Sequence, residues 1–121
     1  MANTFKVVNF AAEPNSAGTP FTMYTVASST TTVVLVLILA NIHTTAVTAE
    51  VELVSTTSNR AWNNNASNGT SFLVKDVNIP AGTSLELLSG GKVVLEAGDV
   101  IRVDCSVADK LSGTLSIMEI T

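Results

Sequence analysis

Apolar and polar residues alternate along much of this chain. The clearest stretch covers residues 47–56, in which the odd positions from Val47 to Leu53 are apolar and the even positions from Thr48 to Glu52 are polar. Successive side chains of a β-strand point to opposite faces of the sheet. Alternation of this kind is therefore typical of a strand with one face on a core and the other toward solvent.

The same pattern, followed along the whole chain, predicts eight or nine strands. They are expected at residues 4–10, 21–27, 32–42, 47–56, 71–79, 83–88, 92–96, 99–107 and 113–120. Segments rich in Gly, Pro, Asn and Ser separate the strands at intervals of roughly 10–12 residues, a spacing typical of sandwiches and barrels. No helical periodicity is sustained anywhere in the sequence. We therefore predict an all-β protein: an antiparallel β-sandwich with jelly-roll-like topology and eight or nine strands.

Two local features of this layout can also be predicted. Residues 32–42 and 46–56 flank a short turn, so we expect them to pair as an antiparallel hairpin. The alternation within residues 71–79 changes phase near Lys75 and Asp76, which indicates a β-bulge at that point.

The chain is expected to divide at residue 20. Residues 1–20 begin with a short strand and continue into a loop that contains Pro14, Gly18 and Pro20. This segment has few apolar residues to bury by itself, so we expect an N-terminal arm that a neighbour partly orders. Residues 21–121 are expected to form a single β-sandwich domain.

Segment 32–42 differs from the other strands because residues 33–40 (VVLVLILA) are all apolar. With strict alternation, one face carries Val33, Leu35, Leu37 and Leu39, and the other carries Val34, Val36, Ile38 and Ala40. The run is too short for a membrane-spanning helix, which needs about 20 residues. A two-layer sandwich covers one face of each strand, so the second face needs a neighbour. We therefore predict a homo-oligomer whose interface includes Val34, Val36 and Ile38.

The loop at residues 57–70 is rich in Asn, Ser and Thr and contains Trp62. It is the alternative cover for the second apolar face of segment 32–42. An aromatic ring flanked by amides can stack on a sugar ring, so Trp62 is the candidate for a glycan contact. Packing of the Trp62 ring onto one end of the sandwich is the simpler interpretation of the same residue.

The composition supports the β assignment. The chain has 121 residues, the size of one domain, and Val, Ile and Thr account for 38 of them. These β-branched side chains are stiff at χ1 and fit a pleated surface better than a helix. Charged residues make up 13% and apolar residues 46%. That balance excludes intrinsic disorder.

The charge distribution excludes one class of partner. The chain carries a net charge of −4, and its six basic residues occur singly along the sequence. A nucleic-acid binder needs clustered basic groups to neutralise phosphates. We therefore predict no nucleic-acid partner, and the absence of a long apolar run predicts no membrane partner.

Candidate catalytic and metal-binding residues are few. Cys105 is the single cysteine and falls on the apolar side of segment 99–107, and the single histidine, His43, falls in a turn. A metal site needs several ligands, and a nucleophile needs a neighbouring base. Glu50 and Glu52 share the outer face of one strand, where charged residues are common. We therefore predict no catalytic, cofactor-binding or metal-binding residues, and no enzyme activity.

The second half of the chain carries three motifs in a fixed order. Residues 73–85 contain L-V-K followed by I-P-A-G and S-L, residues 92–103 read K-V-V-L-E-A-G-D-V-I-R-V, and residues 116–121 end in E-I-T. This order of motifs resembles small virion structural proteins of marine and cyanobacterial phages. The resemblance extends over residues 33–121 and is strongest over residues 72–104.

The resemblance implies a non-enzymatic virion structural protein. Two roles fit it: a capsid decoration (cement) protein, or an accessory protein of the neck or tail. Its implied partners are other virion proteins, such as the major capsid or tail protein, and further copies of itself in a trimer. Localisation in the virion after synthesis in the host cytoplasm agrees with a single cysteine, which cannot form an intrachain disulfide. The alternative function is a carbohydrate-binding or receptor-contact module on the virion that uses Trp62.

Overall fold

The computed structural model describes residues 2–55, 69–88 and 91–121, and these residues form an all-β protein. Its strands are β1 (Asn3–Glu13), β2 (Phe21–Thr25), β3 (Thr31–Asn41), β4 (Val47–Val54), β5 (Thr70–Ile79), β6 (Ser84–Leu87), β7 (Val93–Leu95), β8 (Val100–Cys105) and β9 (Leu111–Ile120). No helix occurs in these ranges. The predicted strand positions match these elements closely, with the largest difference at the first strand.

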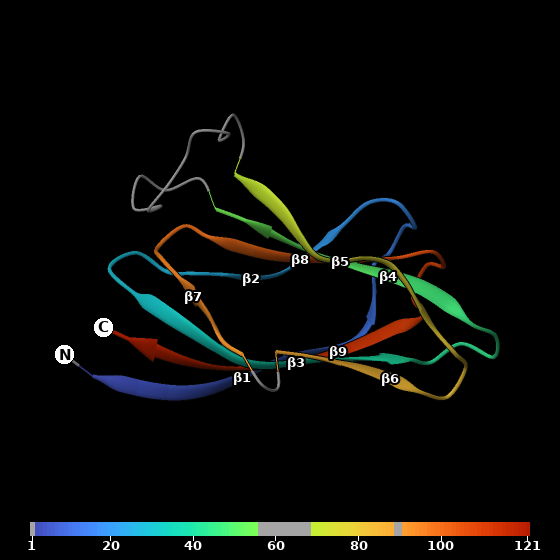
Figure 1. The fold of residues 1–121 in the computed structure, drawn as a ribbon, viewed down its shortest axis with the longest axis horizontal. Coiled ribbons are helices and arrows are strands. Elements are labelled where there is room, and N and C mark those ends of the chain that lie inside the picture. The colour runs from blue at the N-terminus through green and yellow to red at the C-terminus, as the bar shows by residue number, and fades with distance from the viewer. Residues whose placement is uncertain (1, 56–68, 89–90) are drawn as a thin grey trace.

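The strands form two antiparallel sheets that pack face to face (Figure 1). Sheet A has the order β1-β9-β3-β6, with β7 also paired to β3, and sheet B has the order β2-β8-β4-β5. The antiparallel pairs are nested: β4 with β5, β3 with β6 and β7, β2 with β8, and β1 with β9. One long hairpin has therefore been rolled into two layers, which is the jelly-roll arrangement. The predicted fold class is confirmed.

The expected hairpin between residues 32–42 and 46–56 is wrong. β3 lies at the centre of sheet A and β4 lies in sheet B, so the connection between them crosses from one layer to the other. Asn41 organises this crossing. Its buried side-chain amide donates hydrogen bonds to the carbonyl oxygens of Thr45 (3.0 Å) and Ile79 (2.9 Å), and its Oδ1 accepts one from the backbone N–H of His43 (2.7 Å).

The first residues of the chain belong to the sandwich. β1 pairs with β9 in an unbroken register from Asn3 to Phe10, which makes it an edge strand of sheet A rather than an arm outside the fold. The loop that follows is also held by the domain, because the backbone N–H of Asp109 donates a 2.8 Å hydrogen bond to the carbonyl oxygen of Pro14. Residues 3–14 are therefore hydrogen-bonded to the same sandwich that residues 21–121 were expected to form.

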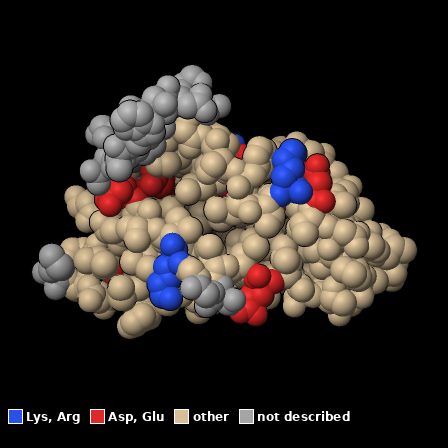
Figure 2. Space-filling model, in the orientation of Figure 1, with Lys and Arg blue, Asp and Glu red and all other residues tan. Residues whose placement is uncertain are grey.

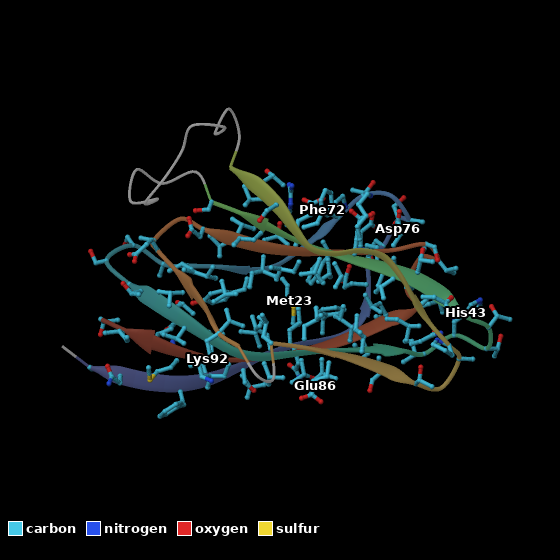
Figure 3. All side chains as sticks on the ribbon, in the orientation of Figure 1. Met23, His43, Phe72, Asp76, Glu86 and Lys92 are labelled. Atoms are coloured by element: carbon cyan, nitrogen blue, oxygen red, sulfur yellow. The ribbon has the colours of Figure 1, made fainter. Side chains whose placement is uncertain are left out.

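The core lies between the two sheets. Met23 projects into it from β2 (Figure 3). Its fully buried larger side chains are Leu37, Leu39, Ile79, Leu95, Ile101, Leu111, Leu115, Ile117, Val34, Val47, Val51 and Val103. At one edge the Phe10 ring covers Gly113 and meets the Phe21 ring edge-on at 5.1 Å, which joins β1 and β9 of sheet A to β2 of sheet B.

A bulge in β3 changes which of its side chains face inward. The pairing of β3 with β9 shifts register between Val34 and Val36, so Leu35 is an extra residue. Val34 and Leu37, three positions apart, are both 0% exposed. The expectation that Val34, Val36 and Ile38 share one face is therefore wrong for Val34, which is a core residue, whereas Val36 and Ile38 lie on the outer face of sheet A.

Candidate interaction surface

A row of apolar side chains crosses the outer face of sheet A. Phe5 of β1 lies opposite Met118 of β9, Met118 lies opposite Val33 of β3, and Val33 lies opposite Val94 of β7. Phe5 is 72% exposed and Val94 is 60% exposed. We call these four residues, Phe5, Met118, Val33 and Val94, the apolar row.

A groove lies beside the apolar row. In the next row of the sheet, Val7 lies opposite Ser116, which lies opposite Val36, and the bulged Leu35 stands next to them. Because the Ser116 side chain is small, a hollow of about 290 Å³ remains; it is lined by Phe5, Lys6, Val7, Leu35, Ser116 and Ile117. Val7 is 65% exposed at its rim. The apolar surface therefore consists of a row of exposed side chains and a groove beside it.

The apolar surface occupies one end of sheet A. One row beyond Val36, the outward residues are Asn9, Thr114, Ile38 and Glu86, so polar groups return. The apolar end is also where the chain's two ends meet (Figure 1), since Ala2 and Thr121 exchange backbone hydrogen bonds of 3.0 and 2.9 Å. Figure 2 shows the sandwich from the side, with sheet B above sheet A, and on that side the charged side chains lie in a few separate groups.

The outer face of sheet B carries charged pairs instead. Arg102 of β8 forms an ion pair with Glu52 of β4, and Lys75 of β5 lies 3.4 Å from Glu50 of β4. The predicted bulge at Lys75 and Asp76 is confirmed, because Ala49 pairs with Val77 while Val51 pairs with Val74.

The two glutamates on β4 each form an ion pair with a basic residue of a neighbouring strand. Glu50 and Glu52 lie on the outer face as expected, and each has a basic partner on a neighbouring strand. The Lys75 ammonium also lies 4.8 Å from the centre of the Phe72 ring. The two carboxylates are therefore part of cross-strand ion pairs.

A small acidic pocket opens at the side of sheet B. It encloses about 190 Å³ and is lined by Gly18, Thr48, Glu50, Asp76, Asp104, Cys105 and Ser106. The Asp104 carboxylate is already engaged, since its Oδ1 accepts hydrogen bonds from the backbone N–H groups of Cys105 (2.8 Å) and Gly18 (3.2 Å). Among the described residues, no group of three His, Cys, Asp or Glu side chains is placed to hold a metal ion.

Sequence reasoning missed this pocket because one wall comes from the loop between β1 and β2. Gly18 in that loop lies far from Asp104 along the chain, and no spacing in the sequence connects them. Cys105 lies where it was expected, on the apolar side of β8, and its thiol is buried. His43 lies in the turn after β3, also as expected.

A polar network closes the gap between β1, β9 and β2. The Tyr24 hydroxyl donates to Glu119 Oε2 at 2.6 Å and accepts from Thr32 Oγ1 at 2.7 Å, and Lys6 Nζ lies 2.7 Å from Glu119 Oε1. Burial, together with the hydrogen bond to Glu119, raises the pKa of Tyr24 to about 12. The hydrogen bonds from Lys6 and then Tyr24 lower the pKa of Glu119 below its usual range.

Trp62 and most of the loop at 57–70 lie outside the described residues, as does Gly90. The glycan contact and the alternative cover for β3 therefore remain predictions from the sequence. Among the described residues, three of the five exposed large apolar side chains, Phe5, Val7 and Val94, lie on the outer face of sheet A.

Comparison with known proteins gives no relative: no family model, no curated protein and no solved structure matches this chain. Within the ranges that the structure describes, no helix is long and apolar enough to cross a membrane.

Proposed function

We propose that this protein is a non-enzymatic structural component of a phage virion, a capsid decoration protein or an accessory protein of the neck or tail. The observation that carries the proposal is the apolar outer face of sheet A. Full burial of a large apolar side chain stabilises a contact by roughly 1.5–3 kcal/mol. Exposed apolar patches of a few hundred Å² usually mark protein–protein contacts.

Two further observations support this role. The three motifs in the second half of the chain resemble phage virion structural proteins. The jelly-roll topology is also one that viral capsid domains use, although the same topology serves lectins and cupins. Because a fold is compatible with many functions, the topology adds weight to the surface argument without replacing it.

The two outer faces suggest how such a protein would sit on a particle. The outer face of sheet A packs against another virion protein, such as the major capsid or tail protein, and against neighbouring copies. The outer face of sheet B, with the exposed Lys75 in its ion pair to Glu50, remains toward water. An apolar partner surface is the chemistry that the row of Phe5, Met118, Val33 and Val94 would recognise.

The test is a proteomic and structural examination of the particles of the phage that encodes the chain. We expect the protein in purified virions at a fixed ratio to the major capsid or tail protein, and cryo-EM density then distinguishes head from neck or tail. A protein that is abundant in infected cells and absent from purified virions would contradict the proposal.

A matched pair of variants ties this role to sheet A. Val36→Glu places a charge on its outer face, and Asn78→Glu places one on the outer face of sheet B. We expect Val36→Glu to reduce incorporation into particles strongly and Asn78→Glu to leave it unchanged. Both variants should remain folded by circular dichroism, because neither position is in the core.

A further inference from the structure

The two sheets have four edges, and proteins usually protect such edges. An edge strand presents unpaired backbone N–H and C=O groups on which another strand can add. Usual protections are short length, a bulge or twist, and charged side chains. Among the residues that the structure describes, the edge strands are β1 on one side of sheet A and β6 with β7 on the other, and β2 and β5 in sheet B.

Three of these edges are protected. β6 and β7 have four and three residues, so neither offers a long template. β2 has five residues, and its register with β8 shifts between Thr22 and Tyr24. β5 is longer, but it is bulged at Lys75 and Asp76, and Asp76 has a left-handed backbone with a φ of 50°.

The fourth edge, β1, has almost none of these protections. It has eleven residues, and its register with β9 is unbroken from Asn3 to Phe10; the shift comes later, between Phe10 and Glu13. Over residues 3–10 its one charged side chain is Lys6, which Glu119 of the same chain neutralises at 2.7 Å. The two most exposed large apolar side chains of the described chain, Phe5 and Val7, both lie on this strand.

We propose that β1 pairs with β1 of a second copy of this chain, antiparallel and about a two-fold axis, so that the two sheets A become one continuous sheet. This inference goes beyond the proposed virion role, which concerns the outer face of sheet A rather than its edge. A second copy is the fitting occupant because an antiparallel strand is self-complementary about a two-fold axis. The edge also carries no net charge, although each chain carries −4, so two copies can approach here.

Side-chain chemistry selects the register. If the axis passed through Lys6, two like charges would lie directly opposite each other, which is destabilising. If the axis passes through Val7, Val7 lies opposite Val7 of the second copy, and Lys6 lies opposite Val8 of the second copy. That register also brings Phe5 opposite Asn9 of the second copy, which leaves the apolar row of the two copies on the same face of the joined sheet.

The size of this contact is sufficient for a weak dimer. Eight extended residues span about 27 Å, and two packed sheets with their outer side chains are roughly 20 Å thick. The edge therefore offers about 500 Å² per copy, or about 1,000 Å² in total, at the low end for a specific interface. We expect dissociation in roughly the micromolar range.

The experiment measures mass and dissociation by light scattering and analytical ultracentrifugation, from about 1 to about 200 µM protein. Wild type is expected to approach twice the 12.6 kDa mass of the chain at the upper concentrations. Val7→Lys should weaken the dimer by about tenfold or more, because two lysines would face each other at the axis. Phe72→Lys is the matched control, since Phe72 is also an exposed apolar side chain of an edge strand but lies on β5 of sheet B, and it should leave the dimer unchanged.

Backbone exchange provides the second measurement. Amides of residues 3–10 that point away from β9 should exchange more slowly as concentration rises, and those of β6 should not change. Phe5→Lys is the second variant if Val7→Lys is poorly folded. A monomeric wild type, a trimeric mass, or dissociation by Phe72→Lys equal to that by Val7→Lys would each overturn edge pairing. None of these outcomes bears on whether the protein is present in virions, so the two proposals fail separately.

Discussion

The outer faces of sheets A and B belong to one sandwich and cover one core, yet they carry opposite chemistry. Sheet A presents the apolar row and the groove beside it. Sheet B presents cross-strand pairs of acidic and basic residues, with Phe72 and Asp76 on the side of the molecule opposite Glu86 (Figure 3). Because the inner faces alone build the core, the outer faces are free to differ.

Two neighbouring residues of β3 show the difference between the inner and outer faces of sheet A most directly. A charge at the inner of these two positions should have the largest effect on stability. Val34 is completely buried, whereas Val36, two positions later, faces outward because of the bulge at Leu35. Val34→Asp should abolish folding or cost more than about 4 kcal/mol, since it buries an unpaired charge. Val36→Asp should cost less than about 1 kcal/mol in the monomer. Urea denaturation followed by circular dichroism measures both.

Equal damage by these two substitutions would mean that β3 alternates strictly and that the bulge is absent. The assay should be run at low protein concentration, so that any loss of self-association by Val36→Asp does not add to the measured change. Under that condition the difference between the variants reports the orientation of the two side chains alone.

The sequence could predict the strands because their period of two and their turn residues are local properties. It could not reveal the bulge at Leu35, because a shift of phase is invisible when every residue from Val33 to Ala40 is apolar. By contrast, the bulge at Lys75 and Asp76 was predictable, since polar residues there interrupt the alternation. A bulge can be predicted from the sequence only where apolar and polar residues alternate, because only then does a shift in the alternation become visible.

Long-range placement was harder to predict than the strands themselves. The turn at His43 is short enough for a hairpin, yet β3 and β4 lie in different sheets, and the buried Asn41 amide holds the crossing through acceptors on Thr45 and Ile79. Likewise Pro14 and Pro20 suggested an arm, whereas pairing with β9 determines the position of β1. The apolar surface was predicted in part, through Val36 and Ile38, while Phe5, Val94 and Met118 joined it through sheet pairing.

The second largest effect is expected at Gly113, where sheet A closes against sheet B. A Cβ on residue 113 would lie 2.4 Å from the Phe10 ring, and the Phe21 ring restricts movement of Phe10. Gly113→Ala should therefore destabilise the fold by about 1–3 kcal/mol. Gly91→Ala is the control, because nothing lies within 4 Å of the corresponding Cβ. Similar unfolding midpoints for the two variants would show that Phe10 does not occupy this position.

Stability at the extremes of pH should depend on the network between the sheets. The folded-state pKa of Tyr24 is about 12 against an ordinary 10.0, so the unfolded chain ionises first and stability falls as the pH rises from about 10 to 12. The pKa of Glu119 is lowered from its ordinary 4.5 in the folded protein. Its contribution to stability is therefore fully present above about pH 4.5 and is lost as the pH falls through the folded-state pKa.

Two variants isolate these contributions. Tyr24→Phe should flatten the alkaline decline relative to wild type, and Lys6→Met should reduce the acid decline, because Lys6 is the main cause of the Glu119 shift. Chemical denaturation at a series of pH values provides the measurement. If stability depended on pH in the same way in wild type and both variants, the hydrogen bonds and ion pair of Tyr24, Glu119 and Lys6 would not contribute to the pH dependence of stability.

The smallest effect is expected on the outer face of sheet B. The Lys75 side chain is 54% exposed, and its ion pairs with Glu50 at 3.4 Å and Asp76 at 3.7 Å are open to water. Exposed pairs contribute roughly 0–1 kcal/mol because solvent screens the charges and ordering two long side chains costs entropy. Lys75→Met should therefore lower the free energy of unfolding only slightly, and the loss should shrink further in high salt. Arg102→Met should cost more, since its partner Glu52 is 8% exposed and would lose its neutralising charge. If Lys75→Met instead destabilised the protein as much as Gly113→Ala does, the charges of sheet B would stabilise the fold, and the contrast between a solvated charged face and an apolar face would no longer hold.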